Sequence, residues 1–293
     1  MGGNQSKSEA ATPQFLSKEW RKIDWGKDQS VLQTLKNYKP EGKHQQLRIL
    51  LHGPVGAGKS SFINSIQSVL LGRMYKHALA ANVFENCFTK KYITYKLKES
   101  PSTFSSIVFS DIMGLGPDKG IPVRDIVLAM KGHVKEGYTF NPESPLSEGD
   151  VFYNSNPGPN DKVHVLVCVV PANTVSQIRG SVVQKIREVR AEASRLGIPQ
   201  LIILTKIDEV CPEIKEDLRN VYKIKYLKEK MELFSVEVGI PMNCIFPVKC
   251  YHEEIELNSD VNSLILSALR DMIHAGEDHI HFNQSRSELL DAP

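Results

Sequence analysis

The 293-residue sequence lacks several features that would place it in a specialised class of protein. The longest apolar run, residues 163–170, is interrupted by His164 and is far shorter than the roughly 20 residues of a membrane span. The first residues carry no apolar stretch of the kind that forms a secretory signal. The net charge is only +2, which excludes a global basic field for binding nucleic acid. We therefore expect no transmembrane segment and no nucleic-acid partner.

Cysteine is also scarce. The five cysteines are an odd number, are scattered along the chain and form no Cys-x-x-Cys pair. A disulfide framework needs paired cysteines, and a zinc site needs closely spaced ligands. The pattern indicates reduced thiols and a cytoplasmic location.

Short apolar segments alternate with helical segments from residue 46 onwards, and no internal repeat is present. This alternation predicts an α/β fold with a mostly parallel sheet flanked by helices. The expected strands lie at 47–51, 92–98, 105–109, 163–170, 201–204 and 244–248. The expected helices lie at 59–71, 123–130, 181–196, 213–234 and 261–273.

Composition divides the chain into an ordered centre and polar ends. Residues 1–14 are small and polar and are predicted to be disordered. Residues 15–45 are predicted to be a helical extension, since apolar residues alternate with charged ones there. The main domain spans 46–275, with a Gly-, Pro- and Asn-rich loop insertion at 131–162. Residues 276–293 are predicted to be a flexible tail.

The strongest motif is Gly53-Pro54-Val55-Gly56-Ala57-Gly58-Lys59-Ser60-Ser61, which matches GxxxxGK[ST] between an expected strand and an expected helix. Glycines let the backbone curl so that its N–H groups point at phosphate oxygens, and the helix amino terminus adds a positive dipole. Lys59 is predicted to reach the β- and γ-phosphates, and the Ser60 hydroxyl to bind Mg²⁺.

A second motif, Asp111-Ile112-Met113-Gly114, directly follows an expected strand. A carboxylate at this position can hold the Mg²⁺ shell, and the backbone N–H of Gly114 can donate to a γ-phosphate. DxxG alone is weak, because any aspartate that ends a strand in a turn looks the same. Its position after the first motif supports the assignment.

The third motif, Thr205-Lys206-Ile207-Asp208, ends the strand expected at 201–204. The Asp208 carboxylate can accept both N1–H and the exocyclic amine of guanine, a donor pair that adenine lacks. The Lys206 stem can lie over the base. The alternatives are an ordinary helix cap and an ATP-binding protein.

These motifs, in this order, are the signature of P-loop GTPases, so the fold is expected to be P-loop GTPase-like, with GTP or GDP and Mg²⁺ as ligands. Residues 15–25, the GPVGAGKSS loop and Val248-Lys249-Cys250-Tyr251-His252-Glu253 resemble the interferon-induced protein 44 family. That resemblance implies a place in the interferon-induced immune response and antiviral defence. Val248 and Lys249 lie where GTPases contact guanine O6 through backbone N–H groups, although the usual Ser-Ala pair is missing.

Hydrolysis is a separate question. Ras-like GTPases place a glutamine after DxxG to orient water, and here Leu115 follows Gly114. We therefore expect a slow or partner-assisted switch, with no catalytic residue assigned. Thr89 is the preferred switch threonine for Mg²⁺, and Thr94 is the alternative.

The remaining expectations concern partners. Met1-Gly2-Gly3-Asn4-Gln5-Ser6 matches an N-myristoylation motif at Gly2, and membrane contact is expected only if that glycine is acylated. The missing glutamine leaves open a homodimer through the nucleotide face, and the sequence names no other partner. An active GTPase with a non-standard catalytic residue and a non-switching scaffold are the alternative functions.

Overall fold

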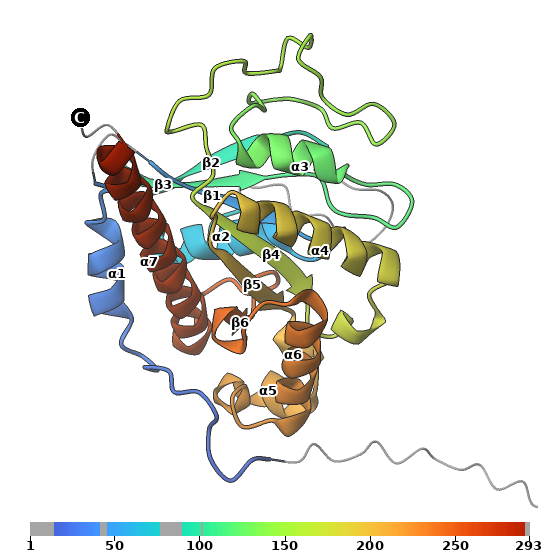
Figure 1. Cartoon of the computed structure of the whole chain (residues 1–293). Helices are drawn as coiled ribbons and strands as arrows, with labels where there is room; N and C mark the ends of the chain where they lie inside the picture. Colours follow the sequence, from blue (N-terminus) through green and yellow to red (C-terminus); the bar gives the residue numbers. More distant parts are fainter. Residues whose placement is uncertain (1–14, 42–45, 77–89, 101, 291–293) are drawn as a thin grey trace, which may run out of the picture.

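A six-stranded sheet in the order β2-β3-β1-β4-β5-β6 runs through the centre of the molecule (Figure 1). All neighbouring strands are parallel except β2 and β3, which are antiparallel. The central strands are buried along almost their whole length, because helices cover both faces. The expected mostly parallel α/β fold is confirmed. The strands are β1 (Leu47–His52), β2 (Ile93–Lys98), β3 (Phe104–Asp111), β4 (Val165–Pro171), β5 (Gln200–Thr205) and β6 (Ile245–Pro247).

The structure is a computed structural model that describes residues 15–41, 46–76, 90–100 and 102–290. The disorder predicted for 1–14, the acylation motif at Gly2 and the switch residue Thr89 lie outside these ranges.

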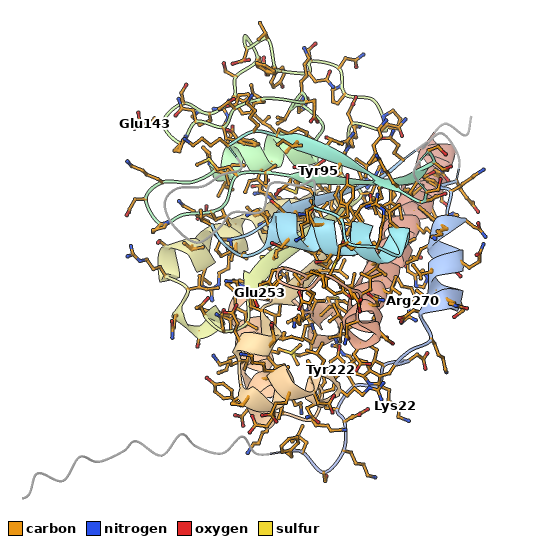
Figure 2. The ribbon with its side chains drawn as sticks, turned by 180° about the vertical axis from the view of Figure 1, so that it is seen from behind. Lys22, Tyr95, Glu143, Tyr222, Glu253 and Arg270 are labelled. Atoms are coloured by element: carbon orange, nitrogen blue, oxygen red, sulfur yellow. The ribbon has the colours of Figure 1, made fainter. Side chains whose placement is uncertain are left out.

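Helices form a layer on each face of the sheet. The helices α2 (Lys59–Leu71) and α7 (Ser259–Leu290) lie on one face, with α1 (Asp28–Lys36) packed on α7, as the view from behind shows (Figure 2). The other face carries α3 (Val123–Met130), α4 (Gly180–Arg195) and α6 (Lys225–Val238), with the short α5 (Pro212–Glu216) below them. None of the helices in the described ranges is long and apolar enough to cross a membrane.

Helix α7 is much longer than the expected 261–273, so the prediction of a flexible tail from 276 is wrong for residues 276–290. The helix continues because its inner face stays in the core beyond Ile273: Ile280 is buried, and Gly276 lies against β1. A Cβ atom on Gly276 would come within 2.4 Å of Leu47 Cδ1. A side chain at residue 276 would therefore require Leu47 and Val165 to shift.

The helix expected over 213–234 is broken into α5 and α6 by an irregular turn. The Asp217 side chain accepts the backbone N–H of Arg219, which caps a short 3₁₀ turn. The turn buries Val221 and Tyr222. Trp20 packs edge-on against Tyr222 with the ring centroids 5.1 Å apart. The break therefore provides a binding surface for the amino-terminal segment.

Within its described part, residues 15–41, the extension preceding the sheet contains the helix α1. Before it, the Arg21 guanidinium donates to the carbonyl of Ile245, 224 positions away, at 2.6 Å, and to the carbonyl of Met242 at 2.5 Å. The same guanidinium lies 5.4 Å from the Phe246 ring centroid. Residues 15–41 are thus bonded to the edge of the sheet at β6.

The insertion at 131–162 contains no helix or regular strand, as expected. It is anchored through the buried Asp125 of α3, which accepts the Leu146 N–H at 2.9 Å and the Tyr138 hydroxyl at 3.4 Å. Burial raises the pKa of the Asp125 carboxyl, an effect that these hydrogen bonds oppose. Backbone bonds between Tyr92 and the segment at Gly137 and Tyr138 add a second anchor.

Candidate nucleotide-binding site

Four loops meet at the edge of the sheet where the parallel strands end. Gly53 to Gly58 follow β1, Ile112 to Leu115 follow β3, Lys206 follows β5 and Val248 follows β6. In open α/β sheets, ligands bind outside the carboxyl ends of the strands. The topology therefore gathers all three sequence motifs around one site.

The loop between β1 and α2 is folded as a phosphate cradle. Gly53, Gly56 and Gly58 have φ angles of 138°, 74° and 88°, which side chains rarely adopt. At Gly53 a Cβ atom would lie 2.0 Å from the carbonyl oxygen of Val169, so no other residue fits there. Helix α2 begins at Lys59 with no side-chain cap, and Ser61 lies in its first turn. Its first N–H groups thus face the position that a phosphate would take.

Lys59 is buried and lies back on its own loop. Its ammonium donates to the carbonyls of Pro54 at 3.3 Å and Gly53 at 3.5 Å. None of the ion pairs within the described residues includes Lys59. The hydrogen-bond partners of this buried cation within the described ranges are neutral carbonyls, and a cation in such surroundings is suited to an incoming anion.

The two predicted magnesium ligands are in contact. The Ser60 hydroxyl donates to the Asp111 carboxylate at 2.6 Å, and both side chains are buried. Within the described ranges no group of three or more His, Cys, Asp or Glu side chains is placed to hold a metal. The oxygens of Ser60 and Asp111 are ligands of the kind that Mg²⁺ takes, since this ion binds one or two protein oxygens and completes its shell with phosphate and water. The alternative threonine, Thr94, lies on β2, where its hydroxyl accepts a hydrogen bond from Arg48 at 3.3 Å.

The DxxG glycine lies directly against the phosphate cradle. Leu115 donates its N–H to Gly53 at 2.8 Å and accepts the N–H of Val55 at 3.1 Å. A Cβ atom on Gly114 would come within 2.7 Å of the Val55 Cα. The Leu115 side chain is buried, with 1% of its surface exposed. The residue at the usual glutamine position therefore points into the core.

Thr205 connects the third motif to the cradle. Its hydroxyl donates to the carbonyl of Ala57 at 2.6 Å. Lys206, which follows, has a φ of 57°, the left-handed conformation that a tight turn requires. The turn carries Asp208 to the same side as the cradle. The buried hydroxyl thus fixes the distance between the phosphate end and the base end of the site.

Asp208 is held by a cation from the neighbouring loop. Lys249 Nζ lies 3.7 Å from the Asp208 carboxylate and 2.8 Å from that of Glu254. Burial raises the pKa of Glu254, but the hydrogen bonds from Lys249 and from the His252 backbone outweigh it and lower the pKa to about 2. Sequence reasoning missed Glu254, and no spacing or motif signals its role.

The backbone N–H groups of the loop after β6 differ in what they bind. The Val248 N–H donates to the Leu204 carbonyl at 2.7 Å, so it continues the sheet and is not directed at a base. The hydrogen bond expected to guanine O6 would therefore come from a backbone N–H group after Val248, the first of which is that of Lys249. Ser65 of α2 accepts the Tyr251 N–H at 2.9 Å and holds this loop against the cradle helix.

His52, the last residue of β1, was also missed from the sequence. Its side chain is only 2% exposed, and it pairs with Cys168 across the sheet. Burial, with the nearby Lys59 charge, lowers the pKa of His52 from 6.5 to about 3. The imidazole at the base of the cradle is therefore neutral at physiological pH.

This buried histidine predicts an acid-sensitive fold. Between pH 6.5 and 3 the unfolded chain binds a proton at His52 that the folded chain excludes, so stability falls as pH falls. Through this group, lowering the pH from 7.5 to 5 should reduce the free energy of unfolding by about 2 kcal/mol. The free energy of unfolding of His52→Leu, measured in urea, should therefore fall by about 2 kcal/mol less than that of the original chain between pH 7.5 and 5. The exposed His274→Leu is the control, and equal losses in both variants would contradict the prediction.

Comparisons with known proteins support the expected relationship. No family model matches the chain. It is 33% identical over 253 residues to interferon-induced protein 44 of Mus musculus and 32% identical over 254 residues to that of Homo sapiens, covering 86% of this chain in each case. Human interferon-induced protein 44-like is 28% identical over 254 residues. The chain spans only 60%, 57% and 56% of these relatives, respectively.

Solved structures with a similar arrangement are remote in sequence. A probable GTP-binding protein engB is 16% identical with a TM-score of 0.42, over 79% of this chain and 98% of that protein. A GTP-binding protein from Sulfolobus solfataricus in complex with GDP is 16% identical with a TM-score of 0.37, over 80% of this chain and 53% of that one. Likeness at this level carries no information about the ligand.

Proposed function

Because the chain is a homologue of the interferon-induced protein 44 proteins, we propose that it is a guanine-nucleotide-binding switch of the interferon-induced immune and antiviral response. The observation that carries the nucleotide part is the convergence of the Gly53–Ser60 cradle and Asp208 at one edge of the sheet, joined by the Thr205 hydrogen bond. The names of the relatives support the biological context.

Each side chain then has a defined task in binding. Lys59 leaves the carbonyls of Gly53 and Pro54 for the β- and γ-phosphates, which offer full negative charge. Ser60 and Asp111, which contact each other, would hold Mg²⁺, and the ion would neutralise phosphate charge. At the other end Asp208 accepts two N–H groups of guanine, with Lys249 holding its carboxylate in place.

The DxxG loop is the element that would sense the γ-phosphate. Gly114 accepts the N–H of Ile121 at 3.1 Å, which closes residues 114–121 into a tight loop. Lys185 of α4 donates to the carbonyls of Gly116 at 2.8 Å and Pro117 at 3.3 Å. A γ-phosphate that accepts a hydrogen bond from the Gly114 N–H would shift this loop. The shift would be transmitted to α4 through the hydrogen bonds of Lys185.

Turnover should be slow because the chain has no water-orienting group at the usual position. Leu115 is apolar, and both its backbone groups are engaged by the cradle. Faster hydrolysis would need a residue supplied by a partner or by a second copy across the nucleotide face. The protein would then remain in the GTP state until such a partner arrives.

Restoring the glutamine should not restore catalysis. Leu115→Gln is expected to leave single-turnover GTP hydrolysis within about twofold of the original rate, because the side chain points into the core. Burying the amide should instead cost about 1–3 kcal/mol of unfolding free energy. Hydrolysis of radiolabelled GTP and thermal unfolding measure the two effects, with the exposed Leu233→Gln as the control. A tenfold faster hydrolysis would refute this account.

Nucleotide competition tests the proposed function directly. A fluorescent GDP analogue bound in the presence of Mg²⁺ should be displaced by GDP and GTP about 100-fold better than by ATP, because adenine lacks the donors that Asp208 accepts. Equal displacement by ATP would favour the ATP-binding alternative. Failure of every nucleotide to bind would favour a scaffold that keeps only the fold.

A further inference from the structure

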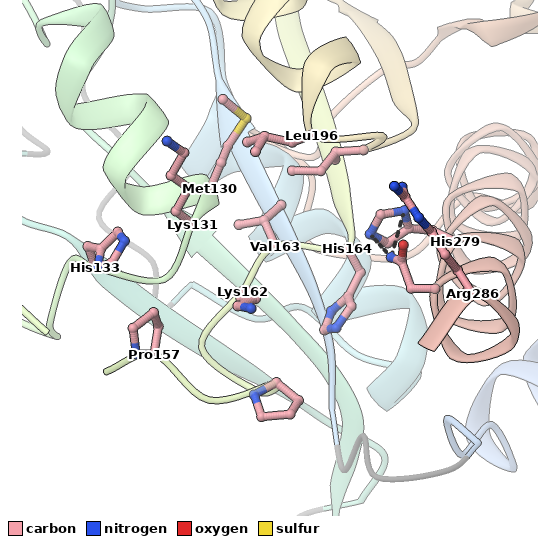
Figure 3. Close-up of a pocket in the computed structure, with 13 residues that line it drawn as sticks. Met130, Lys131, His133, Pro157, Lys162, Val163, His164, Leu196, His279 and Arg286 are labelled. Atoms are coloured by element: carbon pink, nitrogen blue, oxygen red, sulfur yellow. Dashed lines mark hydrogen bonds between the residues drawn. The ribbon is translucent and has the colours of Figure 1, made fainter. Parts of the chain in front are cut away.

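A cavity lies at the ends of β4 and β5 opposite to those that carry the nucleotide loops, and Figure 3 shows the residues that line it. Its volume is about 760 Å³, within the range of small-molecule sites. It lies where β4 and β5 begin, next to His164 and Ile198, whereas the nucleotide loops follow the other ends of these strands. The end of α3, the insertion and the far end of α7 supply the remaining walls.

The floor of the cavity is apolar. Met130, Val163, Leu196 and Ile198 line it from three separate segments of the chain. Val163, Met130 and Ile198 are almost fully buried and belong to the main core. A ligand with an apolar body of modest size would be desolvated against this floor.

The rim carries positive charge. Lys131, Lys162 and Arg286 line the cavity and are solvent-exposed, and three histidines lie beside them. Among the residues that the structure describes, no aspartate or glutamate lines this cavity. The cavity therefore has the electrostatic character of a site for an anion, although the whole chain carries a net charge of only +2.

The walls are fixed in place by hydrogen bonds. His279 Nδ1 lies 2.9 Å from the Gly197 carbonyl, and His164 Nδ1 accepts the Arg48 backbone N–H at 2.9 Å. His133 Nδ1 lies 2.8 Å from the Asn154 carbonyl, and its ring stacks on Tyr153 at 5.0 Å. Each histidine joins two segments of chain, so the cavity is formed before any ligand binds, which lowers the cost of binding.

We propose that this cavity is a second binding site, which takes a small amphipathic organic anion: a molecule with one phosphate, sulfonate or carboxylate group on an apolar body. The anionic group would lie at the rim between Lys162 and Arg286, and the apolar body would cover Val163 and Ile198. Neither inorganic phosphate nor a cation with the same apolar body satisfies both parts of the site.

Fluorescence of 8-anilinonaphthalene-1-sulfonate tests the site, with GDP at saturating concentration so that the nucleotide cradle is filled. The probe should bind saturably at one site and be displaced by n-octyl phosphate. Inorganic phosphate and octyltrimethylammonium should fail to displace it. The double variant Lys162→Glu/Arg286→Glu should lower the affinity for the probe by about tenfold or more, since two attractive charges become repulsive.

The matched control is Lys18→Glu/Lys215→Glu, which makes the same charge change at exposed positions away from the cavity. It should leave the affinity of the probe unchanged, and both double variants should keep the unfolding temperature and GDP affinity of the original chain. Equal binding of the probe by both variants would overturn the proposal, as would displacement by inorganic phosphate. A chain that binds no GDP but still binds the probe in this pattern would refute the proposed switch and leave this site standing.

Discussion

Asp208→Asn is expected to turn the nucleotide preference from guanine to xanthine. The asparagine amide can donate to the C2 carbonyl of xanthine, while its carbonyl still accepts N1–H; guanine presents an amine at C2 and would meet that amide donor to donor. For guanine, the bond from the C2 amine is lost and the bond from N1–H loses its charged acceptor; together these changes are worth about 3–4 kcal/mol, so GDP affinity should fall about 100- to 1000-fold. Isothermal titration with GDP and XDP measures both changes.

The exposed Glu216→Gln, on the nearby helix α5, is the control for loss of one negative charge. It should change neither affinity by more than about twofold. Asp208→Asn also removes the charge that faces Lys249, which keeps its 2.8 Å contact with Glu254. Unchanged GDP selectivity in Asp208→Asn would refute the assignment of that carboxylate to the base.

Lys59→Ala is expected to abolish nucleotide binding under ordinary assay conditions. The ammonium is the buried charge nearest the phosphate cradle, and its loss removes charge-assisted bonds to two phosphates. Affinity for both GDP and GTP should fall about 100-fold or more, without a change in base preference. Competition binding and the rise in unfolding temperature on adding GDP are the measurements.

The folded state of this variant should survive, because the hydrogen bonds of Lys59 to the described residues go to neutral carbonyls of its own loop. Unfolding without nucleotide checks this point. Lys96→Ala, an exposed lysine on β2, should behave like the original chain in every assay. If Lys59→Ala kept its GDP affinity, the loop at Gly53–Ser60 would not be the phosphate site.

The elements carrying local signals were predictable from sequence. Helices α2 and α3 have the predicted bounds, because an apolar stripe with helical spacing begins and ends inside each. The second half of α7 and the break between α5 and α6 were not predictable. Both depend on contacts with distant residues, Leu47 in the first case and Trp20 in the second.

The residues of the candidate site likewise divide into those with a local sequence signal and those without one. Motif spacing predicted Lys59, Ser60 and Asp111 as phosphate and metal ligands, and the structure places Ser60 and Asp111 in contact beside the loop that carries Lys59. The pairing of Lys249 with Asp208 and Glu254 is a contact between two loops, and no period or motif encodes it. The burial of His52 likewise follows from the helices packed over β1, which the sequence around residue 52 does not describe.

The contact between Arg21 and Ile245 has a consequence for synthesis of the chain. A ribosome adds about 5–20 residues per second, so roughly 10–45 s separate the appearance of these two residues, which lie 224 positions apart. During that interval the guanidinium and the aromatic rings of the amino-terminal segment have no sheet edge to bind. The amino-terminal segment can therefore dock on the sheet only after residue 245 has been synthesised, although it is among the first parts of the chain to be made.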